Sequence, residues 1–208
     1  SSKKVAVITG SGDGLGKGIA ERLAQDGFAI VLSDINPDTL TATEAEFKAR
    51  GAAVSAFLGD VGKREDQFAL VKHAADTFGR VDVFINNAGI EDVMALEDVR
   101  EADIDRVFNI NVKGVIFGTQ AAAEQMKKQG GGRVCKIINA CSIAGHESYD
   151  LLGVYCASKH AVRALTVAAV QVSATSFTLP VPSGSATVLI GACNGDGCGP
   201  TASQGITA

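Results

Sequence analysis

The sequence predicts an α/β fold of three layers, in which helices cover both faces of a doubly wound parallel sheet. Short apolar runs alternate with longer amphipathic segments as far as about residue 171. The runs are rich in Val, Ile and Phe and lack polar alternation, which is typical of strands buried on both faces. With 208 residues, 46% of them apolar, the chain is long enough for one domain with a sizeable core.

Five strands and four helices are expected along this part of the chain. The strands are predicted at Val5 to Thr9, Phe28 to Ser33, Ala52 to Leu58, Val81 to Ile85 and Val134 to Asn139. The helices are predicted near residues 16–26, 38–49, 64–78 and 101–129, with Pro37 and Gly51 at the two ends of the second. Because a helix separates consecutive strands, the strands are expected to run parallel.

Composition and charge exclude several classes of protein. The 19 Lys and Arg residues against 23 Asp and Glu residues give a net charge of −4, so the basic surface that nucleic acids require is not expected. No apolar run reaches membrane-spanning length, and the first residues do not resemble a secretory signal, so we expect a cytoplasmic protein that binds no membrane. The five cysteines form no CxxC pair, which argues against a disulfide framework or a metal site.

The C-terminal part differs in composition from the rest. All Lys and Arg residues lie at or before Arg163, and Asp196 is the one charged side chain from Ala164 onward. A shift of this size divides the chain into a core of residues 1–171 and an atypical segment of residues 172–208. Within that segment, Ala186–Cys193 has the length and apolar character of one further strand, and a flexible tail is expected after it.

A glycine-rich turn follows the first strand and leads into a helix. It reads Thr9-Gly-Ser-Gly-Asp-Gly-Leu-Gly16. Glycines let the backbone approach a pyrophosphate closely, and the N–H groups at the start of a helix attract its charge. An acid at the end of the next strand, Asp34, completes the pattern of a Rossmann dinucleotide site. We therefore expect Gly10, Asp13, Gly14, Leu15 and Gly16 to bind a dinucleotide, although such a turn alone can be merely a turn.

The type of dinucleotide is predicted from Asp34. Its carboxylate can accept hydrogen bonds from both hydroxyls of an adenosine ribose, and it would repel a 2′-phosphate. No Arg or Lys stands in the glycine turn or directly after Asp34 to bind that phosphate. The sequence therefore favours NAD over NADP. The alternative is that Asp34 only caps a turn before Pro37.

Two side chains that can transfer a proton stand four residues apart. Tyr155 and Lys159 share one face if this segment is a helix. A nearby ammonium favours the phenolate, so we expect the pKa of Tyr155 to fall from about 10 toward a useful range. Ser142, at the end of the fifth predicted strand, can hydrogen-bond the same substrate oxygen. Taken alone, Tyr155 and Lys159 could be an exposed pair on a helix, and Ser142 could be a helix cap. The catalytic interpretation depends on all three residues occurring together.

Five motifs in order resemble the short-chain dehydrogenase/reductase family over residues 3 to about 171. They are the glycine turn, Asn86-Asn87-Ala88-Gly89, Asn111 in Asn-Ile-Asn-Val-Lys-Gly, Ser142, and Tyr155-Cys-Ala-Ser-Lys159. The resemblance implies that Tyr155 is the general acid/base with Ser142 beside it, that Lys159 also grips the nicotinamide ribose, and that Asn111 holds a water in the proton relay. It further implies a homotetramer or homodimer.

The remaining cofactor residues follow from the same resemblance. It places Asp60 and Val61 near the adenine ring and adds Ile35, Asn87, Ala88 and Gly89 to the cofactor site. As a bare acid, Asp60 could instead cap a helix, and Asn87 to Gly89 could be a simple turn. The position of this turn after a predicted buried strand favours a ligand site, because ligands bind at the carboxyl edge of such sheets.

Within the family, four stretches look most like the acetoin (diacetyl) reductase and 2,3-butanediol dehydrogenase branch. They are residues 22–30, 108–122, 138–146 and 159–166. This branch implies reversible hydride transfer between NADH and a small ketone or hydroxyketone. Two alternatives stay open. One is another carbonyl substrate, such as a sugar, a polyol or a 3-oxoacyl group. The other is a dinucleotide-binding protein with little turnover, because the family's Pro-Gly turn and substrate loop are replaced after residue 171.

Overall fold

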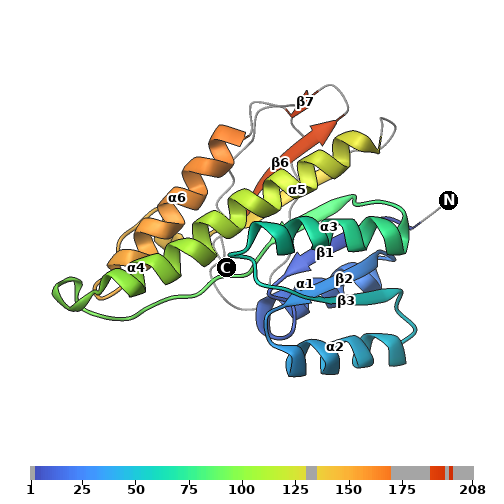
Figure 1. The fold of residues 1–208 in the computed structure, drawn as a ribbon, viewed down its shortest axis with the longest axis horizontal. Helices are drawn as coiled ribbons and strands as arrows, with labels where there is room; N and C mark the ends of the chain where they lie inside the picture. Colours follow the sequence, from blue (N-terminus) through green and yellow to red (C-terminus); the bar gives the residue numbers. More distant parts are fainter. Residues whose placement is uncertain (1–2, 130–134, 170–187, 195–196, 199–208) are drawn as a thin grey trace.

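A seven-stranded sheet forms the centre of this computed structural model, which describes residues 3–129, 135–169, 188–194 and 197–198 (Figure 1). The strand order is β3-β2-β1-β4-β5-β6-β7. The first five strands are β1 (Val5–Thr9), β2 (Ala29–Asp34), β3 (Val54–Leu58), β4 (Val83–Asn86) and β5 (Cys135–Ala140). They all pair in parallel, which confirms the predicted doubly wound sheet.

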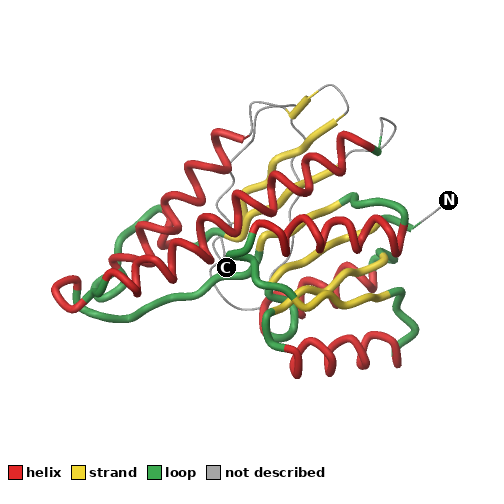
Figure 2. The backbone as a smooth tube through the Cα atoms, in the orientation of Figure 1, coloured by secondary structure: helices red, strands yellow, loops and turns green. Residues whose placement is uncertain are grey.

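Helices cover both faces of the sheet, as Figures 1 and 2 show. They are α1 (Gly14–Gln25), α2 (Pro37–Ala49), α3 (Arg64–Phe78), α4 (Glu101–Phe108), α5 (Gly114–Lys128) and α6 (Gly153–Ala169). Alternate residues of β1 divide between the two faces: Val5 and Val7 pack with residues of α3 and α5, whereas Ala6 and Ile8 pack with residues of α1 and α2. Among the described residues, no helix is long and apolar enough to cross a membrane.

Several details differ from the sequence prediction; the strand predicted at Val81–Ile85, for example, is β4 at Val83–Asn86. The strand predicted at Ala52–Leu58 begins at Val54, and it is not buried on both faces: its side chains are half-buried, and Leu58 is 56% exposed. The reason is that β3 lies at the edge of the sheet, where one side lacks a neighbouring strand. The helix predicted at residues 101–129 is interrupted between α4 and α5 by a π-helical turn, Asn109–Lys113.

The C-terminal strands run against the parallel sheet. β6 (Val188–Asn194) pairs antiparallel with β5, and β7 (Gly197–Cys198) pairs antiparallel with β6. The strand predicted at Ala186–Cys193 overlaps β6, but Ala186 lies outside the described residues, as do most of residues 172–208. The division of the chain at residue 171 therefore stays a prediction.

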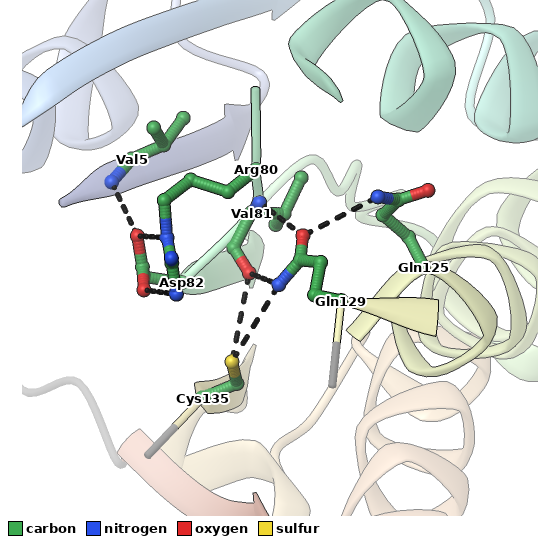
Figure 3. A network of polar contacts seen from close by, with 7 residues as sticks. All are labelled: Val5, Arg80, Val81, Asp82, Gln125, Gln129 and Cys135. Atoms are coloured by element: carbon green, nitrogen blue, oxygen red, sulfur yellow. Dashed lines mark hydrogen bonds and ion pairs between the residues drawn. The ribbon is translucent and has the colours of Figure 1, made fainter. Parts of the chain in front are cut away.

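A polar network around the buried Asp82 and Val81 ties the amino ends of β1, β4 and β5 together, and it reaches β5 through Cys135 (Figure 3). The Asp82 carboxylate accepts hydrogen bonds from the backbone N–H of Val5 at 2.9 Å and from Arg80 Nε and Nη2 at 2.8 and 2.7 Å. The bond to Asp82 raises the pKa of Arg80. The Gln129 amide pairs with both the N–H and the carbonyl of Val81. These contacts fix the register of the strands at the edge opposite their carboxyl ends.

Candidate functional site

A cavity of about 520 Å³ opens at the carboxyl ends of the parallel strands. This is the edge where ligands bind in doubly wound sheets. The order of the strands reverses there, since β1 has β2 on one side and β4 on the other. Every residue predicted to bind the cofactor lines the cavity except Gly14: these are Gly10, Asp13, Leu15, Gly16, Asp34, Ile35, Asp60, Val61, Asn87, Ala88, Gly89, Tyr155 and Lys159. Asn111 and Ser142 are not among the residues that line it.

Close backbone contacts require glycine at two positions of the turn after β1. Gly10 has a φ of +62°, and a Cβ there would lie 2.8 Å from the Cα of Ala88. A Cβ on Gly16 would lie only 2.0 Å from the carbonyl oxygen of Gly10. The turn can therefore pass between β4 and the start of α1 only without these side chains.

The start of α1 is open to an anion. Gly14 has a φ of +51°, and no atom lies within 4 Å of the position that a Cβ would take. Asp13 occupies the N-cap position, but its side chain makes no capping hydrogen bond. The first N–H groups of a helix have no partner within the helix, so those of α1 are available to a phosphate. This backbone cradle fits the pyrophosphate of a dinucleotide.

Asp34 is held by the turn and still faces the cavity. Its Oδ2 accepts a hydrogen bond from the N–H of Gly12 at 2.9 Å, and its Oδ1 accepts one from the N–H of Asn36 at 3.0 Å. The second bond is the turn contact that the alternative interpretation expected, but Asn36, not Asp34, caps α2. Each carboxylate oxygen can accept a further bond, so the side chain is fixed in place and can also bind two hydroxyls.

Asn87 ties the ends of β1 and β4 together. Its Nδ2 donates to the carbonyl oxygens of Thr9 and Gly10 at 2.9 and 3.0 Å. The Thr9 hydroxyl in turn accepts from the N–H groups of Asn87 and Ala88 at 3.0 and 3.1 Å. Both amide protons of Asn87 are therefore used, and its Oδ1 is left for a ligand. Nothing in the spacing of the sequence indicates the part that Thr9 takes.

Apolar side chains form the wall near Asp34. Leu15 and Ile35 are 42% and 67% exposed, although they line the cavity, and Val61 in the loop after β3 lines it too. Apolar side chains of this kind suit contact with a flat ring. Asp60 accepts a hydrogen bond from the N–H of Gly62 at 2.9 Å. It does not cap α3, whose N-cap residue is Lys63, so the helix-cap alternative for Asp60 is wrong.

Tyr155 and Lys159 stand together on the first two turns of α6. Lys159 Nζ lies 5.7 Å from the centre of the Tyr155 ring and donates a hydrogen bond to the carbonyl oxygen of Ala140 at 3.1 Å. Burial raises the pKa of Tyr155, and a hydrogen bond with Ser142 acts in the opposite direction. Burial also lowers the pKa of Lys159. The expectation that the pKa of Tyr155 falls is therefore wrong, because desolvation outweighs the effect of the Ser142 hydrogen bond.

Ser142 has two roles at the end of β5. Its Oγ accepts a hydrogen bond from the N–H of Ala144 at 3.2 Å, so it caps a short 3₁₀ turn, Ile143–Gly145. A hydrogen bond between its hydroxyl and the phenol acts to lower the pKa of Tyr155. A hydroxyl has one proton to donate in addition to the bond that it accepts. Ser142 can therefore cap the turn and donate to a substrate oxygen.

Asn111 is buried in the π-helical turn and braces the site from behind. Its Oδ1 accepts from the N–H of Ile90 at 2.9 Å, and its Nδ2 donates to the Ile90 carbonyl at 2.8 Å and to Ser158 Oγ at 3.0 Å. It thereby joins the loop after β4 to α6. Sequence reasoning missed Ser158 as a partner, although it lies within the Tyr-Cys-Ala-Ser-Lys motif. It also missed Ile90, Glu91, Ile110 and Cys141 in the cavity wall.

The cavity wall is acidic. It carries four carboxylates, Asp13, Asp34, Asp60 and Glu91, whereas Lys159 is the one basic residue among the described residues that line it. A ligand with further negative charge would meet repulsion near Asp34, where no cation stands among these residues to offset it. Among the described residues, no cluster of side chains is suited to hold a metal ion.

Comparisons with known proteins agree with this geometry. The family model described as short chain dehydrogenase matches residues 4–176. Diacetyl reductase [(S)-acetoin forming] of Staphylococcus epidermidis is 54% identical over 168 residues, which cover 81% of this chain and 65% of that protein. The Staphylococcus aureus protein of the same name is 40% identical over 171 residues, which cover 82% of this chain and 66% of that protein. The chain thus spans about two thirds of the length of these relatives.

A solved structure provides an independent comparison of the fold. A short chain dehydrogenase/reductase from Burkholderia phymatum, in complex with NAD, matches with a TM-score of 0.76 and 38% sequence identity. The match covers 79% of this chain and 58% of that one. With the family model, the relatives and this structure in agreement, the chain belongs to the short-chain dehydrogenase family.

Proposed function

We propose that the chain is an NAD(H)-dependent oxidoreductase for a small ketone and its alcohol, of the diacetyl, acetoin and 2,3-butanediol class. The observation that carries this proposal is the arrangement of one cavity. Tyr155 and Lys159 stand at one end, and the glycine cradle and Asp34 stand at the other. The names of the relatives support the substrate class, since both staphylococcal proteins are diacetyl reductases.

The residues at the Asp34 end favour NADH over NADPH. The first turn of α1 would hold the pyrophosphate, and Asp34 would accept hydrogen bonds from the adenosine ribose. The acidic wall around Asp34 would repel a 2′-phosphate. NAD in the structure from Burkholderia phymatum supports the same choice. When bound, the dinucleotide supplies or accepts the hydride at its nicotinamide ring.

In the direction of reduction, the side chains of this chain move one proton. The hydride adds to the carbonyl carbon, and Tyr155 donates its phenolic proton to the carbonyl oxygen, which yields the alcohol. Ser142 donates a hydrogen bond to that oxygen while negative charge develops on it. Because burial raises the pKa of Tyr155, the phenol is protonated at neutral pH and ready to donate. The reverse reaction needs the phenolate as the base.

Lys159 and Asn111 keep this geometry in place. The bond from Lys159 to the Ala140 carbonyl fixes the ammonium between α6 and the end of β5. Its remaining protons can bind ribose hydroxyls. Asn111 holds the loop that carries Ile90 against α6, so the loop and the Tyr155 ring keep their separation. We also propose a homo-oligomer, which light scattering of the purified protein would test.

The two tyrosines of the chain allow a matched test. NADH oxidation with diacetyl or acetoin is followed at the nicotinamide absorbance. Tyr155→Phe should lower turnover by at least about 100-fold and leave NADH binding intact, because general acid catalysis contributes on that scale. Tyr149→Phe is the control, because Tyr149 is exposed and bonds Glu147 instead. Retained turnover in Tyr155→Phe would refute the assignment of Tyr155.

A second candidate is a dinucleotide-binding protein with little turnover. One observation favours it: the match to the family model ends at residue 176, so the residues that follow are not matched to the family. The segment that follows in the family covers the substrate, so its replacement would affect turnover more than cofactor binding. Tight NADH binding without reduction of any small ketone would support this candidate. Reduction of other carbonyl compounds but not of diacetyl would support a different substrate.

A further inference from the structure

One acid stands at the reaction end of the cavity without a role in the proposed mechanism. Glu91 lies in the loop after β4, and it lines the same cavity as Tyr155 and Lys159. The side chain is exposed to solvent. Among the described residues it has neither a hydrogen-bond partner nor an ion-pair partner. The loop that carries it passes beside the ammonium, since a Cβ on Gly89 would lie 3.4 Å from Lys159 Nζ. The charge of Glu91 also acts to raise the pKa of Tyr155.

Neither neighbouring cation is paired with Glu91. The adjacent acid, Asp92, is paired with Arg106, so this arginine is already neutralised. Lys159 is buried and donates to the Ala140 carbonyl at the wall of the cavity. A second negative charge near Tyr155 would therefore be attracted by Lys159 and repelled by the unpaired Glu91. Because the attraction of Lys159 is the same in the wild type and in a Glu91 variant, a comparison of the two isolates the repulsion by Glu91.

We propose that Glu91 is a specificity-determining residue that admits neutral carbonyl substrates and rejects those with a carboxylate next to the reacting carbonyl. The inference rests on the proposed function and deepens it by naming the substrate property that the site selects. Diacetyl and pyruvate provide a closely matched pair. Both present a methyl ketone of similar size, but a carboxylate in pyruvate replaces the second acetyl group of diacetyl.

The test removes the charge of Glu91 and keeps its shape. Glu91→Gln is compared with the wild type by measuring kcat/KM for diacetyl and for pyruvate at saturating NADH and low salt. We expect kcat/KM for pyruvate to rise about five- to tenfold in Glu91→Gln. This is the effect of removing the repulsion between two negative charges, Glu91 and the pyruvate carboxylate, at a separation of roughly 7 Å in a half-solvated site. The value for diacetyl should stay within about twofold. Glu97→Gln is the control, because Glu97 is exposed in a 3₁₀ turn after the Glu91 loop, Leu96–Asp98, and does not line the cavity.

Three results would overturn the inference. One is an equal change for both substrates. Another is an equal effect of Glu97→Gln, which would indicate a general effect of net charge. The third is a rise in KM for diacetyl in Glu91→Gln with no gain for pyruvate, which would make Glu91 a hydrogen-bond partner of the neutral substrate.

A binding measurement separates this inference from the proposed function. If the wild type reduces neither compound, the proposed function fails, and pyruvate and its neutral amide are titrated calorimetrically into the protein saturated with NADH. Tighter binding of the amide in the wild type, with the difference lost in Glu91→Gln, would still support charge selection by Glu91. Equal dissociation constants in the wild type would overturn it.

Discussion

Replacing Asp34 by Asn should change the preference between NADH and NADPH. Asparagine keeps the shape of the side chain and removes its charge. The carboxylate now accepts N–H donors from Gly12 at 2.9 Å and from Asn36 at 3.0 Å. An amide can accept only one of these bonds with its oxygen, because its NH₂ group faces the other donor. A loss of about 1–3 kcal/mol in stability should therefore accompany the change in preference.

The size of the effect on NADPH follows from charge repulsion. A phosphate monoester carries about −1.5 to −2 charges at pH 7. In the ribose position it would lie roughly 5 Å from the half-exposed Asp34 carboxylate, where the effective dielectric constant is about 40–80. The repulsion is then about 1–3 kcal/mol, and removing it should strengthen NADPH binding roughly five- to 100-fold. Loss of charge-assisted bonds to the ribose hydroxyls should weaken NADH binding roughly fivefold or more.

The assay compares kcat/KM for the two cofactors with the same ketone. In Asp34→Asn, the ratio for NADPH over NADH should rise at least about tenfold above the wild type. Asp38→Asn is the control, since Asp38 is exposed in the first turn of α2 and does not line the cavity. A ratio within twofold of the wild type would refute the role of Asp34. An equal rise in Asp38→Asn would show that net charge alone sets the preference.

Three further outcomes are expected from the same structure. Gly16→Ala should lower the free energy of unfolding, measured by thermal denaturation, by at least about 3 kcal/mol, because the new Cβ would overlap a backbone oxygen. Gly18→Ala is the control: open space surrounds Gly18, so this variant should raise the free energy of unfolding by about 0.5–1 kcal/mol. Asp82→Asn should lower the free energy of unfolding by about 2–4 kcal/mol without lowering the turnover of the folded protein. Asp76→Asn, at an exposed ion pair, should lower it by less than about 0.5 kcal/mol. Loss of turnover in Asp82→Asn without loss of stability would contradict this prediction. Alcohol oxidation needs the phenolate of Tyr155, and burial raises the pKa of this group, so the oxidation rate should increase with pH through the alkaline range. Ketone reduction needs the phenol, so its rate should decline only where the phenol ionises. An oxidation rate that falls with alkaline pH would contradict the assignment of Tyr155.

The regular part of the fold was predictable because burial on both faces leaves a plain signal. β1 has the predicted bounds, since all five of its residues are buried. The edge position of β3 was not predictable in the same way, because Val54, Ala56 and Phe57 read as buried until the neighbours of the strand are known. The π-helical turn was hidden too, since Asn109–Lys113 fits a continuous helix by periodicity.

At the site, the sequence predicted which residues lie together better than it predicted how they interact. Gly10, Asp34, Tyr155 and Lys159 stand in one cavity, as expected. The direction of the pKa shift of Tyr155 was wrong because it depends on how far the phenol is desolvated, which residue spacing does not reveal. The contact between Asn111 and Ile90 joins segments that approach only when α4, α5 and α6 are packed. Long-range contacts of this kind leave no local pattern in a sequence.

The polar network around Asp82 has a consequence for how such a protein can diverge. It secures β1, β4 and β5 at their amino ends, whereas the loops that recognise ligands extend from their carboxyl ends. Substitutions in the loop around Glu91 leave the Asp82 and Gln129 contacts intact. New substrate preferences can therefore be acquired by changes in the loops, while the anchoring of the strands is inherited unchanged.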